Sequence, residues 1–265
     1  MTDPTEHQGK LSDLLGKWPK GAVAVQAWLD GQGISRQLAD RYRHFHWLKR
    51  IGRGAYSRLN ENVDWAGALY AMQQQLNLPI HVGAKTALEL QGYAHYLPMA
   101  EGRTIWLFGP PRVKPPAWFQ KRDWGDRPRY TATNLFQSSP DLGLTKKQMD
   151  DYSIRLSAPE RAMLEFLDQL PGSQAFEESQ QLMEGLTTLR PELVSQLLEN
   201  CRSVKAKRLF LLLAEICGHQ WLSELDLKKV DLGKGKRLLV KGGHYDRKYR
   251  ISVPFKRPDT EQIPA

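Results

Sequence analysis

The first fifty residues carry three segments in which apolar positions recur at helical spacing. This pattern predicts helices over residues 9–18, 23–32 and 36–46. The third segment follows a Gly-Gln-Gly turn. Ser35 stands directly before it, where a hydroxyl oxygen accepts a hydrogen bond from the first helical turn. Apolar residues at i, i+4 and i+7 would face the core, so the polar side chains of this helix are expected to point outward.

Two strand-like runs, residues 47–51 and 55–59, come next and are joined by a Gly-Arg-Gly turn. Short strands around a glycine turn predict a β-hairpin. The order helix, helix, tight turn, helix, hairpin is that of a winged helix-turn-helix, and it places Arg53 at the tip of the wing. A further helix over residues 64–76 ends at an Asn-Leu-Pro sequence, where we place a domain boundary.

The rest of the chain mixes predicted helices and strands. We therefore expect an α+β fold, with an N-terminal winged helix-turn-helix DNA-binding domain in residues 1–78 and a larger mixed α/β domain in residues 79–265. The expected elements of the second domain are helices over residues 85–91, 159–170, 175–186, 191–201 and 204–218, and strands over residues 103–108, 130–136, 152–156, 236–240 and 249–253.

The net charge of +9 favours an anionic partner, such as nucleic acid, an acidic protein or anionic lipid. Lys and Arg outnumber Asp and Glu at both ends, in residues 1–60 and 201–265, so each end is expected to meet an anionic partner. Two isolated cysteines offer neither a zinc quartet nor a disulfide framework, which suits a reducing cytoplasm. The longest apolar run is too short for a membrane span, and no apolar signal segment is visible. We expect a cytoplasmic protein without a membrane partner.

The helix over residues 36–46 has the chemistry of a recognition helix in the major groove of double-stranded DNA. Ser35 and the N–H groups behind it suit a phosphate, while Arg36 suits guanine and Gln37 suits adenine. Basic side chains farther along suit phosphate contacts, which give affinity without sequence information. The alternative is a solvated face on a three-helix interaction domain. The expected DNA-contacting residues are Ser35, Arg36, Gln37, Arg41, Arg43, Lys49, Arg50, Arg53, Tyr56 and Arg58.

Motifs of catalytic and metal sites are missing from the sequence. It contains no Gly-x-Ser-x-Gly, Cys-x-x-Cys or His-Glu-x-x-His, and its seven histidines show no metal-ligand spacing. The glycine-rich basic segment 233–237 does not match a phosphate-binding loop, and no helix signal follows it. It is expected to be a basic turn between strands. We expect no catalytic residue, no metal and no cofactor.

Basic residues begin the most apolar helix of the second half. Positive charge at a helix N-terminus opposes the helix dipole. These side chains therefore either form the charged end of a buried core helix or serve a partner. The residues expected to form a contact surface in the C-terminal half are Lys205, Lys207, Arg208 and Lys241.

An ordered set of short motifs spans both halves of the chain. The motifs are residues 33–38 (GISRQL), 47–56 (WLKRIGRGAY), 63–71 (VDWAGALYA), 81–92 (HVGAKTALELQG), 159–162 (PERA), 207–210 (KRLF), 232–237 (LGKGKR) and 241–243 (KGG). In these motifs the chain resembles the AbiEi-type antitoxins of type IV toxin–antitoxin systems, which act in abortive infection, a form of phage defence.

The resemblance implies a winged helix that binds inverted repeats in the promoter of its own operon and represses it. It also implies a C-terminal domain needed for antitoxicity and a nucleotidyltransferase-like toxin encoded beside it. Type IV antitoxins counter the toxin's effect without a stable complex, and whether these two proteins bind directly stays open. The DNA-contacting role carries over only to the matched helix and wing, from Ser35 to Arg58. We expect an antitoxin and transcriptional autorepressor without catalytic activity.

A second interpretation belongs to a different class of protein. The chain would be a nucleic-acid-processing enzyme or a protein-binding adaptor that uses the winged helix only as a platform. An enzyme needs a cleft of polar groups with perturbed pKa values, and the sequence supplies no evident one. Nucleotide transfer or hydrolysis by the pure protein would favour the enzyme, whereas tight protein binding with weak duplex binding would favour the adaptor.

Overall fold

The computed structural model describes residues 4–93, 102–170, 174–238 and 243–254. By its internal contacts the chain forms two compact units, each built from several stretches of sequence. Unit 1 comprises Met1–Val82, Pro98–Thr133 and Thr145–Leu156, and unit 2 comprises Gly83–Leu97, Asn134–Leu144 and Ser157–Ala265. The contiguous division into residues 1–78 and 79–265 stays a prediction.

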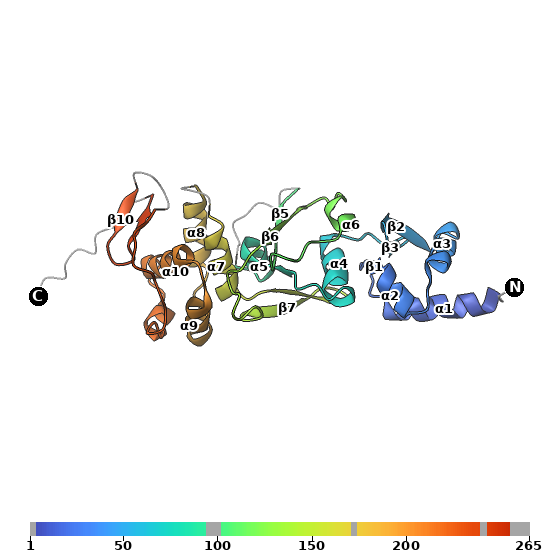
Figure 1. Cartoon of the computed structure of the whole chain (residues 1–265), viewed down its shortest axis with the longest axis horizontal. Coiled ribbons are helices and arrows are strands. Elements are labelled where there is room, and N and C mark those ends of the chain that lie inside the picture. Colours follow the sequence, from blue (N-terminus) through green and yellow to red (C-terminus); the bar gives the residue numbers. More distant parts are fainter. Residues whose placement is uncertain (1–3, 94–101, 171–173, 239–242, 255–265) are drawn as a thin grey trace, which may run out of the picture. The chain divides into compact units, whose positions relative to one another are not determined.

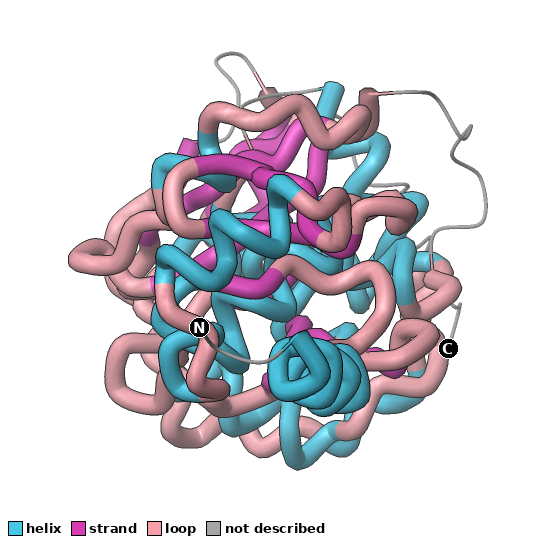
Figure 2. Tube along the Cα trace, turned by 90° about the vertical axis from the view of Figure 1, so that its right-hand side faces the viewer, coloured by secondary structure: helices cyan, strands magenta, loops and turns pink. Residues whose placement is uncertain are grey.

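Unit 1 begins with the element order of a winged helix-turn-helix (Figure 1). Its short strands form a three-stranded antiparallel sheet in the order β1-β3-β2. The helix expected over residues 23–32 begins later, at Gln26, because the residues before it pair with β3 instead. The elements are α1 (Pro4–Lys17), β1 (Ala24–Val25), α2 (Gln26–Gly31), α3 (Arg36–His44), β2 (Leu48–Gly52) and β3 (Ala55–Arg58). Figure 2 shows α1 nearly end-on.

One hydrophobic cluster holds these elements together. Trp18 at the end of α1 is 1% exposed, and its indole N–H donates to the carbonyl of Ala22 at 2.9 Å, so the buried ring leaves no polar atom unpaired. Leu29, Ile34 and Tyr42 from α2, the turn and α3 are fully buried in the same cluster. Burial of each such side chain stabilises the fold by about 1.5–3 kcal/mol, which fixes α3 by its inner face.

A buried helix joins the winged helix to the rest of unit 1. In α4 (Trp65–Tyr70) the Asp64 carboxylate accepts from the N–H groups of Ala66 and Gly67 at 2.9 and 3.0 Å. The helix continues as a π-helical segment, Ala71–Gln75, in place of the single helix expected to residue 76. The Gln75 amide accepts from the Val25 N–H at 2.8 Å and donates to the Val23 carbonyl at 2.9 Å, so it extends the hydrogen bonding of β1.

A five-stranded mixed sheet completes unit 1, in the order β6-β5-β4-β8-β7. β5 pairs parallel with β6 and antiparallel with β4, and β4 pairs parallel with β8. A loop that carries one short helix, α6, connects β5 to β6. The elements are β4 (His81–Val82), β5 (Thr104–Gly109), α6 (Ala117–Gln120), β6 (Arg127–Ala132), β7 (Leu144–Gln148) and β8 (Ser153–Ser157).

Unit 2 is a group of helices with a small sheet of order β10-β11-β9. The helices expected from periodicity are present with shifts of a few residues at their ends. The strand expected over residues 249–253 is shorter than predicted, and residues 239 and 240 of the strand expected over residues 236–240 lie outside the described residues. The elements are α5 (Ala84–Leu90), α7 (Pro159–Asp168), α8 (Gln174–Glu184), α9 (Pro191–Asn200), α10 (Val204–Ile216), the 3-10 helix Gln220–Glu224, β9 (Arg237–Leu238), β10 (His244–Asp246) and β11 (Ile251–Val253).

The structure confirms the expected fold class, a mixed α+β protein with a helical N-terminal part around a small antiparallel sheet. Within the described ranges, no helix has the length and apolar character needed to cross a membrane. In the same residues, His, Cys, Asp and Glu side chains form no group of three or more that would hold a metal ion.

Candidate nucleic-acid interface

The position of α3 is fixed at its start and along its inner face. The Ser35 backbone is extended, and its hydroxyl oxygen accepts from the Leu38 N–H at 3.3 Å, as expected for a helix cap. Ala39 and Tyr42 are fully buried. The face opposite these residues is therefore directed to solvent, and it contains the exposed residues Arg36, Gln37, Asp40, Arg41 and His44.

An acidic residue lies in the middle of this outward face. The Asp40 carboxylate pairs with the Arg43 guanidinium at 2.9 Å, and the His44 Nδ1 lies 3.7 Å from it. Arg43 is thus partly neutralised within its own helix, while Arg36 and Gln37 extend from the first turn. Exposed ion pairs of this kind contribute about 0.2–1 kcal/mol, so a phosphate group can compete for Arg43.

The wing presents a second set of cations. β2 and β3 pair antiparallel with an irregular register between Arg50 and Gly52, and Gly54 has a φ of +73°, which favours glycine. Arg53 is exposed at the tip, and Lys49 and Arg50 are exposed along β2. The helix and the wing hairpin, labelled α3, β2 and β3 in Figure 1, therefore both present positive charge to solvent.

Two residues expected to contact DNA serve the fold of the wing instead. Tyr56 is 9% exposed and belongs to the hydrophobic cluster, because its side chain lies on the inner face of β3. The Arg58 guanidinium donates to the carbonyls of Leu15 and Trp18 and lies 3.5 Å from the Glu61 carboxylate. These contacts hold the Arg58 guanidinium at the end of α1, in place of the phosphate contact expected from the sequence.

Two of the four residues expected to form a contact surface in the C-terminal half are buried. Lys207 and Arg208 are 4% and 1% exposed, because α10 is a core helix on all sides at this point. The Lys205 ammonium donates to the Asp168 carbonyl at 2.6 Å, at the end of α7. Burial lowers the pKa of Lys205, while the Asp168 carboxylate acts in the opposite direction. Lys241 lies outside the described residues.

Arg208 organises the basic turn that follows it in sequence. Its guanidinium donates to the carbonyls of Leu232 and Gly235 at 2.7 Å and to those of Gly233 and Arg250 at 2.8 Å. One buried cation thus donates the hydrogen bonds that these carbonyls would accept from backbone N–H groups in a regular hairpin. Burial lowers the pKa of Arg208, and the neighbouring Arg237 and Arg250 act in the same direction. The turn at residues 233–237 is therefore built around an internal charge.

Sequence reasoning missed an apolar corner beside α3. Phe45 is 60% exposed, Trp47 36% and Leu59 37%. The helical spacing placed Phe45 in the core, but α3 ends at His44 and His46 adopts a φ of +56°. The turn carries Phe45 outward, where its ring lies 5.7 Å from that of Trp47. The spacing of apolar residues did not reveal that the chain turns at His46, which has a left-handed backbone conformation.

These observations define the class of protein, an α+β protein with an N-terminal winged helix-turn-helix whose α3 and wing carry exposed basic side chains. Two family models agree with this definition. One, described as "Transcriptional regulator, AbiEi antitoxin N-terminal domain", matches residues 7–99, and another, described as "Transcriptional regulator, AbiEi antitoxin, Type IV TA system", matches residues 102–254. The chain belongs to the AbiEi antitoxin family of type IV toxin–antitoxin systems, which confirms the resemblance inferred from its motifs.

A solved structure shares the fold. The crystal structure of the RV2827C protein from Mycobacterium tuberculosis is 13% identical and superposes with a TM-score of 0.56 over 95% of this chain and 92% of that chain. Among curated proteins, none matches the chain. Family membership identifies a transcriptional regulator and antitoxin, so DNA and a cognate toxin are its partners in general terms.

Proposed function

We propose that the chain represses the promoter of its own operon by binding inverted repeats with α3 and the β2–β3 wing. We further propose that it counters a nucleotidyltransferase-like toxin encoded beside it, and that it does so without catalysis. The first proposal goes beyond the family description in naming the operator, and the second in naming the toxin's class.

The outward face of α3 is the observation that carries the DNA-binding proposal. The helix is fixed from inside by Ala39 and Tyr42, so its outer face is presented as a rigid surface. Arg36 and Gln37, both exposed, have the donors and acceptors that recognise guanine and adenine edges in the major groove. Lys49, Arg50 and Arg53 supply phosphate contacts beside them, which position a protein on the duplex.

A gel-shift titration tests the operator. The full chain is titrated at physiological salt against its own upstream promoter and a scrambled duplex of equal length. We expect a preference for the promoter of about a hundredfold or more, since specific sites exceed nonspecific DNA by about 10³ or more in typical regulators. Equal binding to both duplexes would contradict specific repression.

Variants of α3 assign the recognition to residues. Gln37→Ala should weaken promoter binding by about 1–3 kcal/mol and leave binding to the scrambled duplex unchanged, because it removes a base contact. Lys229→Ala, which removes an exposed cation of unit 2, is the control. If Gln37→Ala weakened both duplexes equally, Gln37 would contact the backbone rather than a base.

Co-expression tests the antitoxin activity separately. The double variant Arg36→Ala and Gln37→Ala, expressed from a foreign promoter, is expected to keep rescuing cells that produce the neighbouring nucleotidyltransferase-like protein. Rescue needs the second half of the chain under our proposal, whereas repression needs α3. Loss of rescue in this variant at normal protein level would mean that antitoxicity depends on DNA binding.

A further inference from the structure

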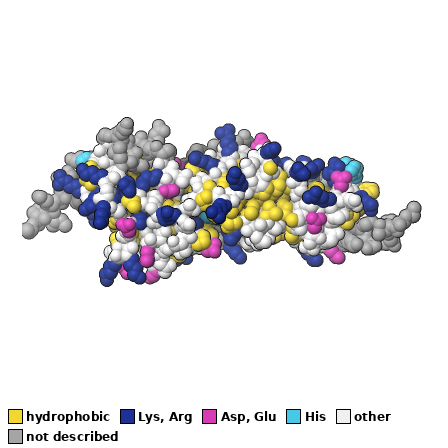
Figure 3. Space-filling view, viewed as in Figure 1, with side chains coloured by type: hydrophobic (Ala, Val, Ile, Leu, Met, Phe, Trp, Pro, Cys, Tyr) yellow, Lys and Arg dark blue, Asp and Glu magenta, His cyan; other side chains and the backbone are white. Residues whose placement is uncertain are grey.

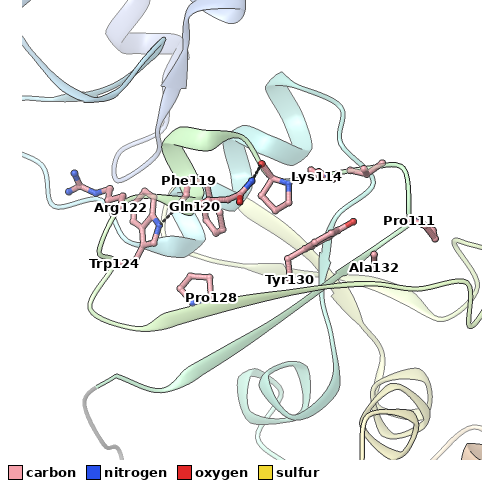
Figure 4. Close-up of a pocket in the computed structure, with 11 residues that line it drawn as sticks. Pro111, Lys114, Phe119, Gln120, Arg122, Trp124, Pro128, Tyr130 and Ala132 are labelled. Atoms are coloured by element: carbon pink, nitrogen blue, oxygen red, sulfur yellow. Dashed lines mark hydrogen bonds between the residues drawn. The ribbon is translucent and has the colours of Figure 1, made fainter.

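A groove in unit 1 lies between the outer strand β6 and the loop that carries α6. Its volume is about 560 Å³, within the range of ligand-binding pockets. Pro128 and Tyr130 of β6 form one wall, and Phe119 and Gln120 of α6 form the other, as Figure 4 shows. The space-filling view in Figure 3 shows hydrophobic side chains gathered over the region of α6 with Lys and Arg side chains beside them.

The strand beside this groove has an open edge. β6 ends the sheet order and pairs only with β5 in the described structure. The N–H groups of Arg127 and Thr133 donate to carbonyls of the β5 side at 2.7 and 2.9 Å. Because backbone groups alternate along a strand, Pro128, Tyr130 and Ala132 direct theirs to the open edge. The side chains of these same three residues line the groove.

The opposite edge of the same sheet offers a contrast. There β7 carries the exposed residues Lys146 and Lys147, charged side chains of the kind that protect an edge strand from pairing. β6 instead places an apolar groove beside its edge. Pro128 has no N–H, so an added strand would find donors only at Tyr130 and Ala132, which limits the register of pairing.

The groove is bordered by cations. Lys114 and Arg122 line it, and the buried Nε of Arg122 has no hydrogen-bond partner. The Arg122 guanidinium lies 5.1 Å from the centre of the Trp124 ring, at one end of the groove. Asp123 is also present in this loop but does not line the groove. The surface is therefore complementary to an acidic partner.

We propose that β6 and this groove bind an extended, acidic segment of a partner protein. The segment adds to the open edge as a sixth strand, places alternate apolar side chains in the groove, and directs carboxylates to Lys114 and Arg122. Recognition of this kind takes affinity from backbone hydrogen bonds and specificity from the side-chain pockets.

Two other occupants fit less well. Pairing of β6 with β6 of a second copy would bring Arg127 and Arg129 of both strands together, and like charges across strands are destabilising. A single-stranded nucleic acid would need free aromatic faces. The Trp124 ring already lies 5.5 Å from Phe119 and 5.1 Å from Arg122, which leaves Tyr130 as the groove's partly exposed ring without such a contact in the described structure.

Fluorescence anisotropy with the full chain tests the proposal. The probes are a labelled octapeptide of alternating Glu and Val, the same peptide with Lys in place of Glu, and a labelled oligouridylate of similar length. We expect the Glu-Val peptide to bind at least about tenfold more tightly than either other probe. Ala132→Pro should weaken this binding about tenfold, because it removes an N–H that faces the open edge.

Matched variants separate the contact from the fold. Ala132→Ser keeps the N–H and should bind like the wild type. Lys114→Glu should lose about tenfold, and Lys146→Glu on the opposite edge should lose little, with unchanged melting temperatures throughout. Absence of Glu-Val binding, or equal binding by wild type, Ala132→Pro and Lys114→Glu, overturns the proposal. Tighter binding of oligouridylate that is lost in Lys114→Glu also overturns it and assigns the groove to RNA.

Discussion

Two arginines of unit 1 and two arginines of unit 2 have opposite surroundings. In unit 1, Arg36 and Arg53 extend from α3 and the wing into solvent. In unit 2, Arg208 is 1% exposed and donates to four backbone carbonyls, and Arg161 is 4% exposed and pairs with Glu165 at 2.8 Å. The same residue type is thus directed to solvent at the first two positions and enclosed by carbonyls or a carboxylate at the other two.

The difference shows why a basic composition does not by itself locate a binding surface. A buried guanidinium has five donors in a planar arrangement, so it can satisfy several carbonyls of an irregular loop at once. Such an arginine adds to the net charge, but it is enclosed by the protein and therefore cannot reach a phosphate in solution. The surplus of Lys and Arg in residues 201–265 therefore contains structural cations as well as exposed ones.

The largest expected effect comes from Arg208. Arg208→Ala should lower the free energy of unfolding by about 3–5 kcal/mol, because hydrogen bonds to a charged group contribute about 1.5–3 kcal/mol each and buried carbonyls lose their donor. Urea denaturation measures the change. Arg247→Ala, at an exposed position of the same unit, should stay within about 0.5 kcal/mol of the wild type. A similar small loss for both variants would contradict the role given to Arg208.

A smaller effect is expected inside the wing itself. Arg58→Ala should lower the free energy of unfolding by about 1–3 kcal/mol, since the carbonyls of Leu15 and Trp18 lose a charged donor. Arg53→Ala, a few residues away, should leave stability unchanged because its side chain is exposed. Urea denaturation of the two variants compares a structural arginine with a solvent-exposed one in the same hairpin. Equal stability of the two variants would contradict the structural role given to Arg58.

Much of the fold could be predicted from local patterns. Helical spacing located α3, α7, α9 and α10, and the cap at Ser35 was located correctly because it depends on neighbouring residues only. The two-residue strands β1 and β4 were not predicted, since such short strands exist only through pairing with distant chain. The alternation of apolar and polar residues within such a short segment does not show which distant strand it pairs with.

For the candidate site, the sequence predicted the exposed residues of the helix and wing tip correctly, but it misplaced several basic side chains. Arg36, Gln37 and Arg53 are exposed as expected, because helix phase and turn position are local properties. Arg58 and Arg208 were misplaced, because their partners are carbonyls that lie many residues away, and Lys207 was misplaced because α10 is buried at this point. The groove beside β6 was missed altogether, since its walls come from a loop and a strand, and local sequence patterns do not show that the two lie side by side.

The wing arginine should be visible in the salt dependence of DNA binding. Arg53→Ala should weaken binding to promoter and scrambled duplex alike and reduce the slope of log affinity against log salt by about one, because one phosphate contact releases its counterion. Gel-shift titrations at several salt concentrations measure the slope. Arg58→Ala is the matched control and should keep the wild-type slope. A slope that falls for Arg58→Ala and not for Arg53→Ala would reverse the assignment.

The smallest expected effect is the pH dependence contributed by Glu160. This carboxyl is 2% exposed, and burial alone would raise its pKa. The Arg190 side-chain hydrogen bonds, at 2.9 and 3.1 Å, act together with backbone N–H groups and the Arg190 charge. In sum they outweigh burial and hold the pKa of Glu160 below its ordinary value of 4.5. A depressed pKa in the folded state stabilises the fold fully above the unfolded-state value. That stability is lost as the pH falls through the folded-state pKa, so the effect belongs to the acid side of pH 4.5.

Urea denaturation between pH 7 and pH 3 measures this contribution in the wild type and in Glu160→Gln. The wild type should lose stability more steeply on acidification, because the variant has no carboxyl to protonate at this position. The effect is small since Arg190 is 62% exposed and water screens its charge. Glu192→Gln, an exposed position on α9, should follow the wild type. If Glu160→Gln and the wild type lost stability in parallel, the ion pair of Glu160 with Arg190 would contribute nothing to the fold. The contrast between solvent-exposed and structural charges would then rest on the buried arginines alone.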